Sequence, residues 1–286
     1  MHILLFVLTV GTTTLVGIEY YASYAGAFGT VPVVIDRSFL VDGLIYSAAL
    51  LGILGAHEMG HYLACRYYDV DATLPYFLPF PGWPITGTLG AVIRIREPFP
   101  TRKALFDIGV AGPIAGFVVL VPLLLYAMSR STLVHAPMPE VGLSFAEPLL
   151  FKLVEWLKFG RIDDGVQLNL HPIGFAAWFG MLATAWNLLP FGQLDGGHLT
   201  YATLGDRSRY FSMATVAAAI VMCFISTNWI LMTVLMLVML YFFGPRHPRP
   251  LDEEEPLGGS RYAVAVFALV MFVLCFMPIP ITALGQ

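Results

Sequence analysis

Residues 39–66 have the sequence FLVDGLIYSAALLGILGAHEMGHYLACR, an apolar run long enough to cross a bilayer that carries His57, Glu58 and His61. On a helix, positions four residues apart share one face, so the two imidazoles can bind one metal ion. The Glu58 carboxylate falls beside them, where it can accept a proton from water at the metal. Ionisable groups in hydrocarbon are costly, so this placement indicates a metal-dependent active site within a membrane.

The composition of the whole chain agrees with a membrane protein. Its 286 residues are 58% apolar and only 12% Asp, Glu, Lys and Arg, and the mean hydropathy is +0.76. A soluble domain of this length needs more charge to cover its surface. The net charge is -4 and no basic run is present, which argues against a nucleic-acid partner. Cys65, Cys223 and Cys275 are widely spaced, and we interpret them as packing residues.

The apolar segments predict an all-α polytopic membrane protein in which residues 1–286 form a single membrane domain. No Lys or Arg precedes the first segment, so we expect a retained span instead of a cleaved signal peptide. Residues 210–243 can form either a tight helical hairpin or one long helix. The seven expected spans, with the hairpin counted as two, cover residues 2–24, 39–66, 104–128, 172–193, 210–226, 229–243 and 262–280.

The distribution of basic residues predicts the orientation. With the N-terminus in the cytoplasm, cytoplasmic segments hold ten Lys and Arg residues and the other side holds five. The positive-inside rule supports this arrangement, and it favours the hairpin because one long helix would reverse the balance. No organellar transit peptide is visible, so we expect a bacterial or archaeal cell membrane. The N-terminus and the active-site opening are expected on the cytoplasmic side.

A second polar motif, NLLPFGQLDGGH at residues 187–198, follows another apolar span. Catalytic zinc usually takes three protein ligands and leaves one position for water. His57 and His61 supply two ligands, and Asp195 is the natural third. Gly196 and Gly197 would let the backbone come close to the site.

The same motif carries residues whose role stays open. Pro190 would break or kink the helix and leave carbonyls free near the metal. Asn187 can either satisfy those carbonyls or hydrogen-bond the substrate. His198 can touch the site, but we expect it to face the water-filled mouth. Gly109, Gly112 and Gly116 are expected to let helices approach closely.

Three segments between the spans have their own patterns. Residues 73–96 are rich in Pro and Gly and then extended, which predicts a re-entrant β-hairpin-like segment whose edge pairs with an unwound substrate. The alternative is an ordinary cytoplasmic loop. Gly87 and Gly90 are the candidate substrate contacts in this segment. Residues 145–158 are amphipathic and predict a helix in the membrane interface, and residues 245–261 predict a polar loop.

Together these motifs resemble the site-2 protease family of intramembrane zinc metalloproteases. His57-Glu58-x-x-His61 matches the family's zinc motif, and Asn187-x-x-Pro190-x-x-x-Leu194-Asp195-Gly196 matches its second motif. The run from Thr73 through Phe117 is similar to the subgroup that includes chloroplast members. The inserted PDZ-like and terminal CBS-like domains of other relatives are not expected here.

The resemblance implies a three-helix catalytic core over residues 39–205, formed by spans two to four. It implies one Zn²⁺ per chain held by His57, His61 and Asp195, with Glu58 as the catalytic base. The implied activity is cleavage of peptide bonds within or near transmembrane segments. The expected partners are membrane-protein substrates, the lipid bilayer and an unidentified regulatory membrane protein.

Two other functions fit part of the pattern. A prenyl-protein-processing metallopeptidase would share the first motif, but its third ligand is typically a Glu in a different context, so Asp195-Gly196 disfavours it. A non-catalytic zinc-binding membrane protein or transporter would keep the three ligands. It would have no need of Glu58, so the intact carboxylate argues against it.

Overall fold

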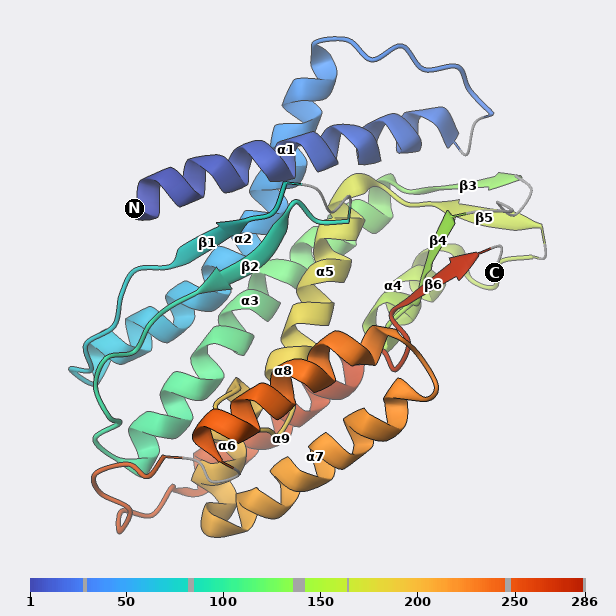
Figure 1. The fold of residues 1–286 in the computed structure, drawn as a ribbon. Coiled ribbons are helices and arrows are strands. Elements are labelled where there is room, and N and C mark those ends of the chain that lie inside the picture. Colours follow the sequence, from blue (N-terminus) through green and yellow to red (C-terminus); the bar gives the residue numbers. More distant parts are fainter. Residues whose placement is uncertain (28–29, 82–84, 136–141, 164, 245–247, 285–286) are drawn as a thin grey trace.

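Long helices dominate the structure, a computed structural model that describes residues 1–27, 30–81, 85–135, 142–163, 165–244 and 248–284 (Figure 1). The prediction of a mostly helical chain is confirmed. In chain order the elements are α1 (His2–Gly26), α2 (Ser38–Tyr67), β1 (Tyr76–Pro79), β2 (Thr88–Val92), α3 (Arg102–Arg130), β3 (Thr132–His135), β4 (Gly142–Phe145), α4 (Leu149–Phe159), β5 (Val166–Asn169), α5 (Pro172–Asn187), α6 (Asp195–Leu204), η2 (Gly205–Arg207), α7 (Ser208–Cys223), α8 (Asn228–Phe243), α9 (Gly259–Cys275) and β6 (Ile281–Leu284).

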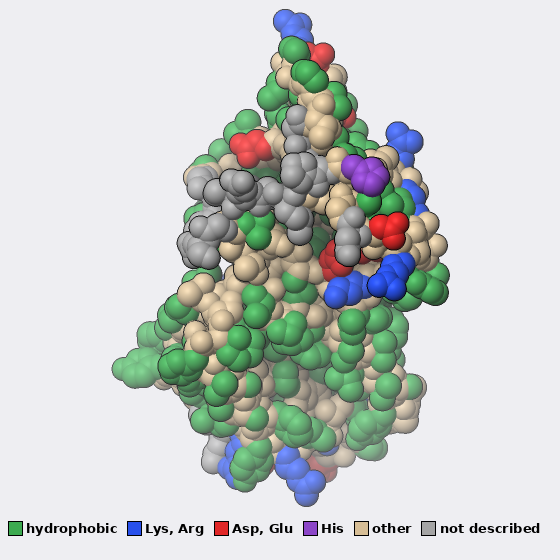
Figure 2. All heavy atoms as spheres, turned by 90° about the vertical axis from the view of Figure 1, so that its right-hand side faces the viewer, with side chains coloured by type: hydrophobic (Ala, Val, Ile, Leu, Met, Phe, Trp, Pro, Cys, Tyr) green, Lys and Arg blue, Asp and Glu red, His purple; other side chains and the backbone are tan. Residues whose placement is uncertain are grey.

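Within the described residues, α1, α2 and α3 are long and apolar enough to cross a bilayer, with 25, 30 and 29 residues. Each of the other predicted spans contains a helix of 16 or 17 residues: α5, α7, α8 or α9. These are shorter than the roughly 20 residues that a full crossing needs. Figure 2 shows a face on which an apolar surface separates charged side chains at two levels. The chain is therefore a membrane protein, and seven crossings remain a prediction.

The centre of the molecule is formed by α2, α3 and α5, which pack against one another. Tyr46 and Leu50 of α2, Leu120 of α3 and Met181 of α5 are at most 1% exposed. Gly180 lets α5 come close to α2, because a Cβ there would lie 2.8 Å from Cγ2 of Ile53. These three helices contain the residues expected for spans two to four.

The β1–β2 hairpin lies beneath α1, which crosses over α2 (Figure 1). The crossing is tight, since a Cβ on Gly43 would lie 2.5 Å from the carbonyl oxygen of Thr14. β1 and β2 are antiparallel, with Tyr76 opposite Val92. Residues 73–96 therefore contain a pair of antiparallel strands, while the re-entry of this segment into the membrane stays a prediction and residues 82–84 lie outside the described part of the chain.

Two further strand pairs, which the sequence analysis did not predict, lie at the other side of the molecule. β3 pairs with β5, and β4 pairs with β6, both antiparallel. The helix predicted over 145–158 is α4, but it begins later because Phe145 belongs to β4 and Pro148 precedes the first helical turn. Pairing between distant strands is not encoded in local periodicity, which explains why these elements were missed.

α7 and α8 form a helical hairpin, so the interpretation of residues 210–243 as two helices is confirmed. They pack through Val216, Ala219, Met232 and Met236. The polar segment that follows ends at Gly259, where α9 begins, slightly before the predicted boundary. Residues 245–247 of that predicted loop lie outside the described residues.

Candidate active site

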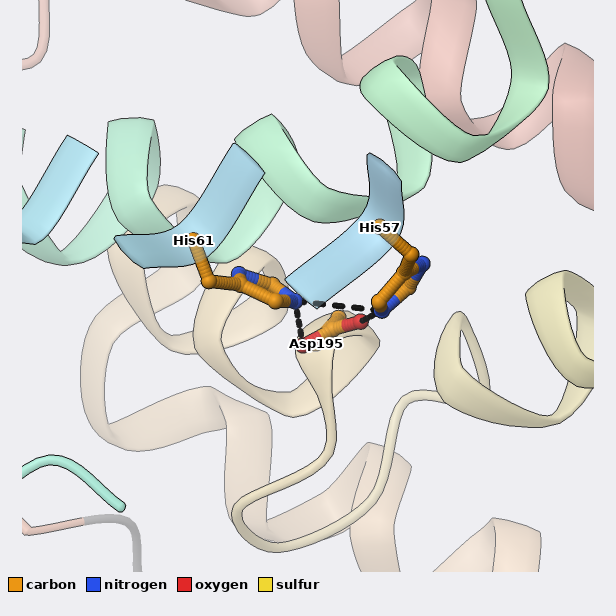
Figure 3. A group of neighbouring side chains, drawn as sticks. All are labelled: His57, His61 and Asp195. Atoms are coloured by element: carbon orange, nitrogen blue, oxygen red, sulfur yellow. Dashed lines mark hydrogen bonds and ion pairs between the residues drawn. The ribbon is translucent and has the colours of Figure 1, made fainter. Parts of the chain in front are cut away.

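One continuous helix, α2, supplies His57, Glu58 and His61. The four-residue spacing places both imidazoles on the side of α2 that faces Asp195 (Figure 3). All three side chains are buried, with 7%, 8% and 7% of their surface exposed. The first motif therefore forms a compact polar cluster inside a mainly apolar helix.

Asp195 lies on the other side of the site, where a turn separates helix α5 from helix α6. α5 ends at Asn187, short of the boundary at 193 that the fourth span was expected to reach. Pro190 has no N–H to continue a helix, so the chain turns before it starts again as α6 at Asp195. The carboxylate consequently lies at a helix N-terminus, where negative charge is favoured.

Two glycines make this turn compact. A Cβ on Gly196 would lie 2.1 Å from the carbonyl oxygen of Leu188, and one on Gly197 would lie 2.3 Å from that of Gly192. Real Cβ contacts do not reach these distances, so larger residues would force the backbone apart. The glycines expected to allow close backbone approach do so by folding the motif onto itself behind Asp195.

The three candidate ligands converge on one point (Figure 3). His57 Nε2 lies 3.2 Å from Asp195 Oδ2, and His61 Nε2 lies 3.3 Å from Asp195 Oδ1. The two Nε2 atoms are 3.1 Å apart. All three ligand atoms lie within 4.8 Å of one another, a spacing that suits a single metal ion.

Hydrogen bonding around the three side chains fits a cation between them. His61 Nδ1 lies 2.7 Å from the carbonyl oxygen of Ile108. Because a carbonyl only accepts, Nδ1 carries the proton and Nε2 of the neutral ring presents a lone pair to the centre. Asp195 Oδ2 is buried, and among the described residues it has no hydrogen bond of suitable geometry although His57 Nε2 lies 3.2 Å away. Two imidazoles and a carboxylate are the donor set of many catalytic zinc sites.

Glycines of α3 make room for both imidazoles. A Cβ on Gly112 would lie 2.1 Å from His61 Nε2, and one on Gly116 would lie 3.2 Å from His57 Cβ. These glycines therefore contact the site as well as letting helices approach, a role that the sequence analysis missed. The available signal was their four-residue spacing, which matches that of the histidines.

Asn187 also reaches the candidate ligands. Its Nδ2 lies 3.2 Å from His57 Nε2, and the residue lines a cavity beside the candidate ligands. The last turn of α5 thus brings a polar side chain beside the candidate metal position. Substrate contact by Asn187 is compatible with this location and stays a prediction.

A cavity of about 530 Å³ opens at the ligands, and the end of the β1–β2 hairpin forms one wall. Ala91, Val92 and Ile93 line this wall, and His198 lines another part of the cavity. The backbone N–H of Ile93 donates to Glu58 Oε2 at 2.9 Å. The hairpin therefore touches the candidate base directly.

The two glycines predicted as substrate contacts lie away from the cavity wall. Gly87 has φ +77°, and a Cβ there would lie 2.6 Å from the carbonyl oxygen of Thr12 in α1. Gly90 has φ +109° and open space around it. The structure thus gives Gly87 a packing role against α1, and the part of the hairpin nearest the ligands is farther along β2.

The polar segment 248–258, which the sequence predicted as a loop, reaches the cavity at its start, where Pro248 contributes to the lining. Arg249 lines the cavity. The N–H of Leu251 donates to the carbonyl of Phe99 at 2.9 Å, and Lys103 pairs with Glu255. A segment beyond residues 39–205 therefore contributes to the site.

A comparison of the sequence with models of protein families assigns the chain to a family. Residues 45–232 match the model of peptidase family M50. The chain belongs to peptidase family M50. The matched range contains the three candidate ligands, Glu58 and Asn187, and it confirms the resemblance to site-2 proteases that the two motifs carry.

The chain is also similar to curated plant proteins of the chloroplast. It is 31% identical to the probable zinc metalloprotease EGY2 of Oryza sativa subsp. indica over 258 residues, which cover 86% of this chain and 44% of the relative. It is 29% identical to EGY1 of Arabidopsis thaliana over 254 residues, 84% and 44% of the two chains. The chain thus spans less than half the length of these relatives. No solved structure shows significant similarity to it.

Proposed function

We propose that the chain is an intramembrane zinc endopeptidase that hydrolyses peptide bonds within or near transmembrane segments of other membrane proteins. The observation that carries this proposal is the convergence of His57, His61 and Asp195 beside the buried carboxylate of Glu58. His57, Glu58 and His61 lie on α2, a helix able to span a bilayer, and Asp195 lies at the start of α6. The relatives that bear zinc metalloprotease names support the same activity.

The residues divide into ligands and a base. His57 Nε2, His61 Nε2 and one oxygen of Asp195 would hold the zinc ion. Bound zinc supplies Lewis acidity and lowers the pKa of water to about 7. Glu58 accepts the proton of the attacking water and delivers it to the leaving amine. Asn187, beside His57, is placed to contact the substrate backbone at the reacting bond.

The substrate is expected to bind in an extended conformation. Helical backbone uses its carbonyls in internal hydrogen bonds, so a transmembrane substrate must unwind before its peptide bonds can be reached. The edge of β2 beside the cavity offers main-chain groups that can pair with such a segment. This edge was predicted from the sequence within residues 73–96, and residues 91–95 of that segment line the cavity.

The seven predicted spans and their orientation complete the proposal. The short helices α5, α7, α8 and α9 would cross with the help of flanking segments, and the cavity would open to the cytoplasm. The ten-to-five distribution of basic residues supports this orientation. The matched relatives are named as plant chloroplast proteins, and a bacterial or archaeal membrane stays a prediction. Single cysteines at Leu251 and Val34, which are 75% and 84% exposed, should label from opposite sides of sealed vesicles.

The decisive experiment compares the wild type with Glu58→Gln. The amide cannot accept a proton, so we expect hydrolysis to fall by about 10²–10⁴-fold with zinc content unchanged. Membrane proteins that accumulate uncut only with Glu58→Gln are the substrates. Glu97→Gln is the matched control, because Glu97 lines the same cavity but binds the backbone of Asp71. Unimpaired cleavage by Glu58→Gln would favour another base, and zinc binding without any cleavage by the wild type would favour a zinc-binding membrane protein.

A further inference from the structure

The ladder between the two arms of the hairpin continues past β1 and β2 toward the end of α2. The carbonyl of Arg94 accepts from Thr73 N at 3.0 Å, and Arg96 N donates to the carbonyl of Asp71 at 2.9 Å. Residues of a strand alternate in the side to which their N–H and C=O groups point. Because Arg94 and Arg96 face the partner arm, Ile93 and Ile95 present their main-chain groups to the open edge.

The open edge at Ile93 meets the candidate base. Ile93 N lies 2.9 Å from Glu58 Oε2, and Glu58 is 8% exposed. Among the described residues, this N–H is the hydrogen-bond donor that reaches the Glu58 carboxylate. A glutamate side chain has three rotatable bonds, so one fixed donor restricts it strongly. Ile93 in turn is held by the ladder on both sides.

We infer that Ile93 is a positioning residue for the hydrolysis, acting through its backbone N–H on Glu58. The hydrogen bond fixes Oε2 and leaves Oε1 for the proton of the attacking water. The inference rests on the proposed function, and it makes the hairpin part of the catalytic arrangement independently of any role in substrate binding. A misplaced base is costly, since an error of about 1 Å can lower a rate by about 10²-fold.

The same geometry fixes where the substrate docks relative to the base. Ala91 precedes Ile93 by two positions, so its N–H and C=O also point to the open edge. It lines the cavity. The two amides are separated by about 7 Å along the strand. A substrate strand paired at Ala91 is therefore held at a constant offset from the carboxylate that activates water, and the hairpin determines which peptide bond is cut.

The test uses the full chain and a substrate found with Glu58→Gln. Ile93→Pro removes the N–H, and a strand residue tolerates a following proline. We expect kcat to fall by about 10–100-fold, as for other groups that orient a catalytic ligand, with KM and zinc content unchanged. Ile93→Ala keeps the N–H and should lose far less of kcat than Ile93→Pro. Ile95→Pro places proline on the same edge without removing the donor to Glu58, and it should lose far less of kcat than Ile93→Pro.

Several results would overturn the inference. These are an unchanged kcat in Ile93→Pro, an equal loss in Ile93→Ala, an equal loss in Ile95→Pro, or a rise in KM alone. If Ile93→Pro does not assemble, an amide-to-ester replacement at Ile93 removes the N–H and keeps the side chain, and the same kcat criterion applies. Failure of the proposed function is seen separately, as absence of cleavage by the wild type with unaltered Ile93.

Discussion

α2 passes the candidate site without a break, whereas the opposite side is built from α5 and α6 with a turn between them. On α2, the spacing of His57 and His61 suffices to align two ligands, because every residue of a helix has a fixed neighbour four positions away. On the other side, the position of Asp195 depends on how residues 188–194 fold. One side of the site is specified locally, and the other depends on close backbone packing.

This difference predicts that substitutions on the two sides affect different properties, zinc binding on one side and stability on the other. The contacts that Gly112 and Gly116 of α3 make with the two histidines are to side chains, which can move, so added bulk there should weaken zinc binding before it lowers stability. The contacts around Gly196 and Gly197 are made to backbone, which cannot yield. Substitutions at these glycines should therefore lower the stability of the fold before they weaken zinc binding.

Removing the ligands should have the largest effect. We expect His57→Ala to lose zinc during purification, because one histidine and a carboxylate from separate elements remain. Asp195→Ala should weaken zinc retention less, since both histidines stay aligned on α2. Metal analysis and chelator competition measure both, with His135→Ala on β3 as the control that keeps zinc. If Asp195→Ala bound zinc as tightly as the wild type, the third ligand would have to be another residue.

Gly196→Ala tests the side of the site where a turn separates α5 from α6. Its Cβ would lie 2.1 Å from the carbonyl oxygen of Leu188, and such overpacking typically costs about 1–3 kcal/mol of unfolding free energy. The matched control is Gly52→Ala on α2, where nothing lies within 4 Å of the added Cβ. That change should be neutral or stabilise by up to about 1 kcal/mol. Unfolding in detergent measures both, and equal stability of the two variants would contradict the comparison.

Gly112→Ala tests the side of the site formed by the unbroken helix α2, because Gly112 of α3 packs against His61. Its Cβ would lie 2.1 Å from His61 Nε2, and the imidazole can swing away while the helices stay packed. We therefore expect zinc affinity to fall by about 10–100-fold with little change in unfolding free energy. Gly116→Ala, whose Cβ would be 3.2 Å from His57 Cβ, should lose less. A large loss of stability with intact zinc binding would mean that Gly112 serves helix packing alone.

The smallest expected effect concerns the start of α5. His171 caps this helix by accepting from Ile173 N, and burial together with nearby Arg130 lowers the pKa of His171 to about 4. The unfolded chain, with a pKa of about 6.5, binds more protons between these values, so stability is complete above about pH 6.5 and declines as the pH falls toward 4.

We expect the Tm of the wild type to drop between pH 7 and pH 5 by about 2–4 °C more than that of His171→Asn, which keeps a cap without titrating. α2 has no side-chain cap at Arg37, so Arg37→Gln should leave the pH dependence as it is. Equal pH dependence of the wild type and His171→Asn would remove His171 from this role.

The predictions made from sequence succeeded where neighbouring residues set the geometry. The places of the long helices, the extended structure within residues 73–96 and the helical hairpin at 210–243 follow from hydrophobic runs, prolines and turn residues. The end of α5 at Asn187 was expected later, at residue 193, although Pro190 was expected to break or kink the helix. The pairs β3–β5 and β4–β6 were missed, because strand pairing depends on distant residues.

The sequence by itself determined the family of the protein, its membrane character and the side chains of the candidate site, since each depends on composition or on fixed spacings along one chain. The tertiary structure decided which of these groups meet. It placed Gly112 against His61, Ile93 N beside Glu58, and Arg249 at the cavity. Contacts of this kind join segments far apart in the chain, and their geometry is set only when helices and hairpin pack together.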